Sequence, residues 1–547
     1  MTVIKEIWKM AEKLKLLSYL LLGLVTAICD FLFVNTLSNV IARISAKTYT
    51  VFSNDYLIVF LLIIFLIVWT RKVSSLIVIK ISQRLLWNYR KRILSMVLKS
   101  NFEQLSKNKV KVFTAMINDV NVLSSVSTNI VGFFTSSIMA IACLVYLAII
   151  STKLFIITLI TALTGCIIYY YGSKRSSDYF QASRNLENDF LKNFKSIIDG
   201  YKEIFMNPQI GKSIYENRII NISNTSYKSN VAAFSNFVKN QITGQILFYI
   251  LLSFILLYFS TVLKVESSDI VRFVFVLMYL FTSIQTIMVL LPGFINAKIA
   301  SDHLLGLQNE LDKLEIDEPS LKTVLSNVVF DEIIVHGLKF QYSEDNGHFT
   351  IGPIDFRIKT GDVVFIYGGN GCGKTTFINS LLGLLTPSYG QITLNGKLVT
   401  KNNNADYRSV FSVVFSDFFL FDEIHGVEEV NLEKWHKYLK LFELEGKVIL
   451  SGKKYSVTDL STGQRKRLAL ITALLEDKPV LVIDEWAADQ DPIFRKKFYT
   501  EIIPFLKHQN KAILAITHDD KYYYCADRLY KMDDGRLFEK KASEIAV

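Results

Sequence analysis

The chain has 547 residues, 51% of them hydrophobic and 20% charged, and its mean hydropathy is +0.30. This balance is too apolar for an ordinary soluble protein of this length and excludes a disordered or fibrous chain. The net charge of +11 would suit a nucleic-acid-binding protein, but residues 1–314 hold 32 basic and 17 acidic side chains, whereas residues 315–547 hold 29 and 33. Because the positive half is also the apolar half, the charge favours a membrane protein with no nucleic-acid partner.

Six segments are long and apolar enough to cross a hydrocarbon core, which needs about 20 helical residues. They are residues 16–36, 55–78, 130–150, 154–172, 242–263 and 269–291. The first follows four lysines and no small-residue cleavage site follows it, so we interpret it as a retained span rather than a signal peptide. The polar stretches 80–129 and 173–241 keep helical apolar spacing, and we expect them to continue helices out of the bilayer.

Basic residues are distributed unequally between the two sides of these spans. Residues 1–15, 80–129 and 173–241 carry 23 Lys and Arg together, against four on the opposite side. By the positive-inside rule, the N-terminus and both long loops are predicted to be cytoplasmic.

The five cysteines lie far apart without CxxC pairs, so neither a disulfide framework nor a structural zinc site is indicated.

Three charged residues interrupt the predicted spans. Asp30 lies well inside the first, where a carboxylate either contacts cargo or a coupled proton or is a satisfied polar residue near the outer interface. Arg71 and Lys72 lie in the second, and we expect both side chains to snorkel to the cytoplasmic interface. Counted from the inner ends of their spans, Asp30 and Arg71 lie about 21 Å and about 8 Å deep. We therefore expect no direct ion pair between them.

The second half of the chain contains a full GxxxxGK[ST] pattern. Residues 365–367 read as a buried strand, residues 368–375 spell GGNGCGKT, and residues 376–385 are a helical run. Glycines let successive backbone N–H groups face phosphate oxygens, and Lys374 and Thr375 are expected on the β- and γ-phosphates and on Mg²⁺. The predicted nucleotide-binding residues of this loop are Gly368, Gly369, Asn370, Gly371, Cys372, Gly373, Lys374, Thr375 and Thr376.

A second buried strand, residues 480–483, ends in two carboxylates. Asp484 is expected to hold Mg²⁺, and Glu485 to polarise the water that attacks the γ-phosphate. The alternative is that both carboxylates merely cap the next turn. Between the two motifs, residues 460–464 (LSTGQ) begin a basic helix whose N-terminus again suits an anion.

Together, these motifs and the six spans resemble ATP-binding cassette (ABC) transporters along essentially the whole chain. The resemblance implies an all-α transmembrane domain of the ABC exporter type with six helices, residues 1–314, followed by an α/β P-loop NTPase cassette, residues 315–547. In that family the LSGGQ-like element of one cassette closes over the nucleotide held by another, so a chain with one cassette must dimerise. Ser461, Gly463 and Gln464 would then act on the ATP of a second copy.

Other positions match the family in turn. Tyr342 resembles the aromatic residue that stacks on adenine, although a strand tyrosine can also be simple core packing. His518 falls where the family places its switch histidine against the γ-phosphate. The motif departs from the family at Ser416 and Asp417, which stand where most cassettes carry a glutamine. Asp417 or Ser416 would replace the Mg²⁺ contact of that glutamine.

A narrower resemblance comes from three runs of the cassette. Residues 485–492 (EWAADQDP), with 464–467 (QRKR) and 517–520 (THDD), resemble bacterial exporters of cyclic peptides, lipopeptides, microcins and siderophores. Within the first run, residues 488–491 resemble the loop that communicates between two ATP sites.

The resemblance implies an ATP hydrolase coupled to export of a peptide-like or amphipathic solute, with ATP and Mg²⁺ as cofactors. We expect a homodimer surrounded by lipid in the bacterial inner membrane, with the N-terminus and cassette cytoplasmic. Two alternatives stay open. One is a flippase for a lipid or lipid-linked glycan, and the other is a membrane-bound ATPase that gates or regulates a partner.

Overall fold

The computed structural model describes residues 13–45, 54–259, 262–263, 265–312, 329–342, 349–457 and 459–540. The chain divides into two compact units, one of residues 1–98 and 105–313 and one of residues 99–104 and 314–547. Each unit is described by itself. The predicted domain boundary at residues 314 and 315 lies outside the described residues, as do Lys5 and Lys9 of the predicted basic N-terminus.

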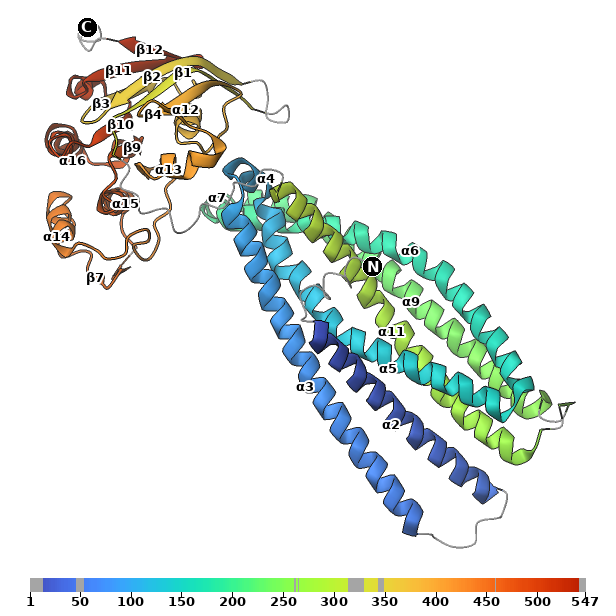
Figure 1. Cartoon of the computed structure of the whole chain (residues 1–547). Helices are drawn as coiled ribbons and strands as arrows, with labels where there is room; N and C mark the ends of the chain where they lie inside the picture. Colours follow the sequence, from blue (N-terminus) through green and yellow to red (C-terminus); the bar gives the residue numbers. More distant parts are fainter. Residues whose placement is uncertain are drawn as a thin grey trace. The chain divides into compact units, whose positions relative to one another are not determined.

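The first unit consists of helices, most of them long (Figure 1). The α-helices are α2 (Lys13–Ser45), α3 (Asn54–Lys99), α4 (Phe102–Thr114), α5 (Val120–Ile150), α6 (Thr152–Asp199), α7 (Tyr201–Met206), α8 (Pro208–Ile214), α9 (Ile220–Phe254) and α11 (Ser267–Asp312). Wider π-helical turns occur at η1 (Ala115–Asp119), η2 (Tyr215–Ile219) and η3 (Ile255–Phe259). Among the described residues, six helical stretches are long and apolar enough to cross a membrane.

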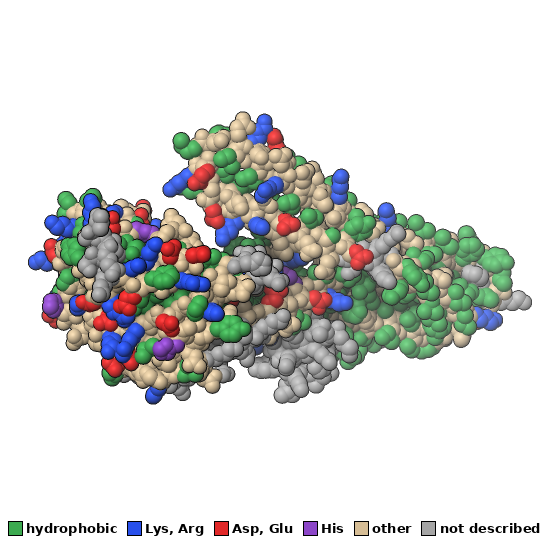
Figure 2. All heavy atoms as spheres, turned by 90° about the horizontal axis from the view of Figure 1, so that it is seen from above, with side chains coloured by type: hydrophobic (Ala, Val, Ile, Leu, Met, Phe, Trp, Pro, Cys, Tyr) green, Lys and Arg blue, Asp and Glu red, His purple; other side chains and the backbone are tan. Residues whose placement is uncertain are grey.

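The long helices continue beyond the predicted spans, as the helical spacing of the polar stretches indicates. Helix α3 runs on to Lys99 and α6 to Asp199. Figure 2 shows hydrophobic side chains covering the long helices toward one end of this unit, and Leu62 and Phe65 are 62% and 71% exposed. So large an apolar surface is stable against lipid or another protein rather than against water.

The helices of this unit pack in two groups. Helix α5 packs along α11 and α2, and α6 packs along α9. The first group encloses a core in which Cys143 and Phe273 are fully buried. A smaller core around Phe180 and Phe237 joins α6 to α9. A cavity of about 530 Å³ lies between α6, α9 and α11.

Helices α2 and α3 are joined by an ion pair, contrary to the expectation from their sequences. The Nη2 atom of Arg71 lies 3.0 Å from Oδ1 and 3.2 Å from Oδ2 of Asp30. The expectation was wrong because it counted depth from the two inner helix ends. Counted instead from Ser45 and Asn54, at about 1.5 Å per residue, Asp30 and Arg71 lie about 22 Å and about 26 Å along their helices. They therefore stand at nearly the same height.

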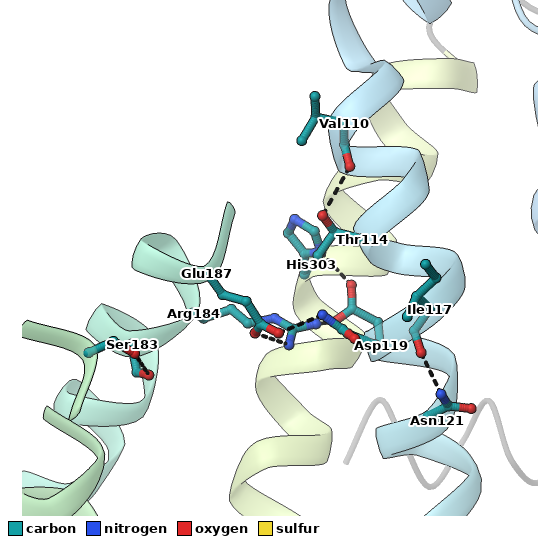
Figure 3. Close-up of polar contacts among 11 residues, drawn as sticks. Val110, Thr114, Ile117, Asp119, Asn121, Ser183, Arg184, Glu187 and His303 are labelled. Atoms are coloured by element: carbon teal, nitrogen blue, oxygen red, sulfur yellow. Dashed lines mark hydrogen bonds and ion pairs between the residues drawn. The ribbon is translucent and has the colours of Figure 1, made fainter. Parts of the chain in front are cut away.

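A second charged cluster ties three helices together (Figure 3). The fully buried Asp119, in the π-helical turn η1, bonds to Arg184 Nη2 of α6 and lies with Oδ2 2.6 Å from His303 Nδ1 of α11. Arg184 also donates to Glu187 at 2.9 Å. A buried carboxylate is stable only with such partners, so the cluster fixes the contact between α6 and the α5–α11 pair.

The described residues of the second unit form three sheets. Its strands are β1 (Glu332–Gln341), β2 (Thr350–Lys359), β3 (Val363–Gly368), β4 (Tyr389–Leu394), β5 (Lys397–Leu398), β6 (Phe411–Val414), β7 (Leu450–Ser451), β8 (Lys454–Tyr455), β9 (Val480–Asp484), β10 (Ala512–Ile516), β11 (Arg528–Asp533) and β12 (Arg536–Lys540). Its α-helices are α12 (Lys374–Leu381), α13 (Asn404–Arg408), α14 (Leu432–Leu441), α15 (Thr462–Leu475), α16 (Pro492–Lys497) and α17 (Ile503–Lys507). The other short helical turns are η5 (Lys401–Asn403), η6 (Trp486–Asp489), η7 (Phe498–Ile502) and η8 (Asp520–Cys525).

The main sheet has six strands in the order β12-β11-β3-β10-β9-β6, and all its pairings except β11–β12 are parallel. A four-stranded antiparallel sheet has the order β2-β1-β4-β5, and β7 pairs with β8. A mainly parallel sheet needs apolar side chains on both faces, which explains the continuous apolar runs of β3, β9 and β10.

The two faces of the main sheet carry different helices. Successive strand residues point to opposite faces. Val363 and Phe365 of β3 pack with α14, α15, α16 and α17, whereas Val364 and Ile366 pack with α12 and the four-stranded sheet. Helices α12 and α15 therefore cover opposite faces of one sheet.

Candidate functional site

The candidate site lies where parallel strands of the main sheet end. Strand β10 pairs with both β3 and β9, and its last residue, Ile516, stands level with Ile366 and Asp484. Strand β6 pairs with β9 on the other side. The loops that leave these carboxyl ends are therefore neighbours, as is usual for ligand sites of open α/β sheets.

The loop between β3 and α12 follows a path that its glycines require. Gly373 has φ +107°, and a Cβ there would lie 2.7 Å from the side chain of Ile351. A Cβ on Gly368 would lie 2.2 Å from the carbonyl oxygen of Met532. Side chains at these positions would force the loop open, so the tight curl around the expected phosphate position depends on the glycines.

Lys374 folds back over this loop. Its Nζ atom donates to the carbonyl oxygens of Gly368 at 3.0 Å and Gly369 at 2.9 Å, and the residue is only 6% exposed. The ammonium group is thus held inside the concave side of the loop. Exposed at the loop are Gly369, Asn370, Gly371 and Thr375, with Cys372 half-buried.

Tyr342 lies beside the helix that begins at Lys374. Its hydroxyl is 3.4 Å from Oγ1 of the buried Thr376, and its ring meets Phe340 edge-on at 5.0 Å. The side chain is half-buried. The structure therefore brings Tyr342 to the nucleotide loop and also gives it a packing role.

Asp484 is the buried carboxylate of the site. It is 1% exposed, its Oδ2 accepts from Ser416 Oγ at 3.1 Å, and its Oδ1 is buried without a partner among the described residues. Burial raises the pKa of this carboxyl, and the Ser416 hydrogen bond opposes that shift. An unpartnered buried carboxylate oxygen is suited to Mg²⁺, which prefers oxygen ligands.

The structure distinguishes the two residues that stand in place of the usual glutamine. Both residues are exposed, but the Ser416 hydroxyl donates to Asp484, whereas the structure gives Asp417 no such contact among the described residues. Within the described ranges, no three His, Cys, Asp or Glu side chains gather to hold a metal ion. This is expected of a cation held by one or two protein groups together with nucleotide phosphates.

Glu485 and His518 come together at the rim of the site. Nε2 of His518 lies 3.3 Å from Oε1 of Glu485, and both side chains are partly exposed. Glu485 has φ +47°, a left-handed conformation that is uncommon for a residue with a side chain. The arrangement places a carboxylate and an imidazole where a water molecule can approach from solvent.

Three residues behind His518 had no role in the sequence predictions. The carboxylate of Asp519 accepts from Arg495 Nη1 at 3.2 Å and from the Tyr499 hydroxyl at 2.9 Å. Arg495 Nη2 also donates to the carbonyl oxygens of Ala488 at 3.0 Å and Gln490 at 3.2 Å. The loop with His518 is thereby tied to the turn after Glu485. No local pattern reveals these contacts, because the two donors lie 24 and 20 residues before Asp519, on a helix and in a π-helical turn.

Ser461, Gly463 and Gln464 begin helix α15. Ser461 Oγ accepts from Gln464 N at 3.4 Å, and Ser461 N donates to Gln464 Oε1 at 3.3 Å, which is a reciprocal capping box. Helices α15 and α12 cover opposite faces of the main sheet, so Ser461 and Lys374 begin helices on different faces. By the family resemblance, the nucleotide loop and residues 460–464 would be the two halves of an ATP site, and we call them half-sites.

Comparisons with known proteins agree with this architecture. The ABC transporter family model matches residues 351–488. The ATP-binding protein SyrD of Pseudomonas syringae pv. syringae is 29% identical over 529 residues, which cover 94% of this chain and 92% of that protein. The putative ABC transporter ATP-binding protein LMOf2365_1216 of Listeria monocytogenes serotype 4b (strain F2365) is 34% identical over 216 residues, 37% of this chain and 78% of that protein.

A solved structure covers both units. The structure of a bacterial Atm1-family ABC exporter with ATP bound superposes with a TM-score of 0.81 at 14% identity, covering 98% of this chain and 96% of that chain. At this identity the likeness shows the fold. The predicted fold class, six apolar helices followed by an α/β cassette, is confirmed.

Proposed function

This chain belongs to the ABC transporter family, and on that premise we propose that it exports a peptide-like solute across the bacterial inner membrane as a homodimer. The chain is a membrane protein of the exporter type in which ATP hydrolysis is coupled to transport. The cargo, the particular membrane, the cytoplasmic orientation and the second copy are the proposal.

The main observation in support of a homodimer is the position of the two half-sites in the cassette. Lys374 begins the helix on one face of the main sheet and Ser461 caps the helix on the other. Two copies related by a two-fold axis can place each nucleotide loop against the helix start of the other copy, since a closed symmetric pair satisfies both half-sites at once. One chain alone leaves both incomplete.

The proposed site then works as follows. Backbone N–H groups of the loop and the Lys374 ammonium bind the ATP phosphates, and Thr375, Ser416 and Asp484 would hold Mg²⁺, which neutralises phosphate charge when bound. The Glu485 carboxylate takes a proton from the attacking water, and His518 orients the γ-phosphate. Ser461 of the other copy completes the cage from the opposite side.

The cargo proposal draws on the cavity of about 530 Å³ between α6, α9 and α11. Its wall is mostly aliphatic and aromatic, with the amides of Gln241 and Gln285 and the hydroxyl of Tyr169 among the few polar groups. A mostly apolar wall with a few amides and hydroxyls suits an amphipathic peptide better than a charged or highly hydroxylated solute. The near-full-length similarity to SyrD and the run of residues 485–492 also support this cargo class.

A lipid flippase is the second candidate function, because the described lining of this cavity contains no charged side chain and would also accept a lipid. Purified protein in proteoliposomes separates the two. We expect ATP-dependent uptake of a fluorescent cyclic lipopeptide that is absent with Lys374→Ala. Movement of a fluorescent lipid between leaflets without peptide uptake would contradict the peptide proposal, and ATP hydrolysis that moves neither would favour a regulatory ATPase.

Mixed dimers test the composite site. With Lys374→Ala on one chain and Ser461→Ala on the other, one ATP site keeps both native halves, so we expect one vanadate-trapped nucleotide per dimer. With both changes on one chain and a wild-type partner, each site loses one half and trapping should disappear. The reverse pattern would show that each ATP site is built within a single chain and would overturn the composite site.

A further inference from the structure

Helix α15 is bonded directly to the turn that follows β9. The carbonyl oxygen of Gly463 accepts from Gln490 Nε2 at 3.1 Å. Arg467 donates to Gln490 Oε1 and to Asp491 Oδ2, each at 2.8 Å. Two runs that are distinctive in the sequence, residues 464–467 and 485–492, are therefore partners in the structure.

Lys466 makes the central contacts of this junction. The residue is 4% exposed, and its Nζ lies 2.7 Å from Oδ2 of Asp489 and donates to the carbonyl oxygen of Glu485 at 3.1 Å. Its own carbonyl accepts from the buried indole Nε1 of Trp486 at 2.7 Å. A buried ammonium needs such acceptors, and here they lie in the short segment that carries Glu485.

These contacts act on the backbone of Glu485. Its N–H donates to the carbonyl of Ile516 at 3.2 Å, and its C=O accepts from Lys466, so both polar groups of a left-handed residue are held. This conformation directs the carboxylate to within 3.3 Å of His518. Without the Lys466 bond, the backbone of Glu485 loses one of its two anchors, so its φ and ψ can relax away from the left-handed region, and that change moves the carboxylate.

We propose that Lys466 is a positioning residue for ATP hydrolysis, which holds Glu485 in its working conformation from helix α15. Lys466 lies little more than one turn from Ser461 on the same rigid helix. In the proposed homodimer, Ser461 faces the nucleotide of the other copy. Lys466 then links the filling of one ATP site to the geometry of Glu485 in the other, and this second step rests on the proposed function.

The test compares variants of the full-length protein in lipid nanodiscs. Lys466→Met keeps the length of the side chain but removes its ammonium. Because a hydrogen bond from a charged group is lost at the residue that positions the water, we expect kcat to fall roughly tenfold or more, with KM for ATP and ATP binding unchanged. Lys466→Arg should retain more activity. Lys496→Met, the same change at an exposed lysine of α16, should match wild type.

Thermal unfolding is measured on every variant, and Asp489→Asn provides a milder second test. That variant loses the ion pair but leaves the bond from Lys466 to Glu485, so we expect a smaller loss of kcat with the same KM. An unchanged kcat in both variants, a kcat that falls only with the folded fraction, or a parallel loss of ATP binding would overturn the positioning role. If Lys466→Met does not fold, Asp489→Asn decides by the same criteria.

The cooperativity of ATP hydrolysis tests the link between the two sites of the homodimer separately from the positioning role of Lys466. We expect a Hill coefficient above one for ATP in wild type and a value near one in Lys466→Met. A wild-type value of one would overturn the link between two sites, while the kcat comparison still decides whether Lys466 positions Glu485.

Discussion

Removal of the Ser416 hydroxyl should shift the pH dependence of the ATPase. Ser416 donates to the buried carboxylate of Asp484 at 3.1 Å, and this hydrogen bond lowers a pKa that burial raises. A hydrogen bond to an ionised group is worth about 1.5–3 kcal/mol. We take the lower end because Ser416 is exposed. Loss of about 1.5 kcal/mol from the ionised form favours the protonated form roughly tenfold, so Ser416→Ala should raise the pKa of Asp484.

The direction of the shift in the pH profile follows from the protonation state in which Asp484 can bind Mg²⁺. Only the ionised carboxylate suits a metal ion, so hydrolysis is lost as the pH falls through the pKa of Asp484, and in Ser416→Ala it is lost at a higher pH. The assay is the pH profile of kcat/KM at saturating Mg²⁺, because its acid limb reports groups of the free enzyme. Asp417→Asn should leave that limb in place. The reasoning is refuted if Ser416→Ala leaves the limb unmoved, or if Asp417→Asn is the change that moves it.

Three further outcomes are expected. Glu485→Gln should bind ATP but hydrolyse it at least about 100-fold more slowly, measured by phosphate release, and near-normal turnover would remove Glu485 from its role. Asp484→Asn should stop hydrolysis yet raise the free energy of unfolding of the nucleotide-free protein at pH 7. Folding raises the pKa of this carboxyl, so its ionised form destabilises the fold. The stabilisation of Asp484→Asn over wild type should therefore shrink as the pH falls below that pKa. Asp119→Ala should lower the free energy of unfolding by about 3 kcal/mol, because it removes the buried carboxylate that faces both Arg184 and His303 and leaves Arg184 with Glu187 alone among the described residues. Glu310→Ala, at an exposed ion pair, should change it by less than about 1 kcal/mol.

The nucleotide loop was predictable because its information is local. The strand, the glycine-rich turn and the start of the helix follow one another without a gap, and Lys374 bonds to the carbonyl oxygens of Gly368 and Gly369 within that run. The ends of β3 and β9 could also be predicted from the sequence, since both strands are short apolar runs that stop at glycine or carboxylate residues. Parallel pairing through β10 then brings those ends together without any further side-chain signal.

The contacts that the sequence did not predict depend on geometry between distant elements. The pair of Asp30 and Arg71 required the matching heights of two antiparallel helices, and counting from the wrong ends hid it. The choice between Ser416 and Asp417 depends on which way the chain turns after β6. The faces of β3 could not be assigned either, because every residue in its apolar run suits a buried position. The sequence therefore did not predict that α12 and α15 lie on opposite faces of the sheet.

Two buried lysines show why burial alone does not identify a binding residue. Lys466 and Lys374 are 4% and 6% exposed. Lys466 has the carboxylate of Asp489 at 2.7 Å, so its charge is balanced inside the protein. Lys374 donates to two neutral carbonyl groups and, within the part of the chain that the structure describes, forms no ion pair. A buried cation with no carboxylate in direct contact is costly until an anion arrives, so the charge at Lys374 favours phosphate binding, whereas the charge at Lys466 fixes structure.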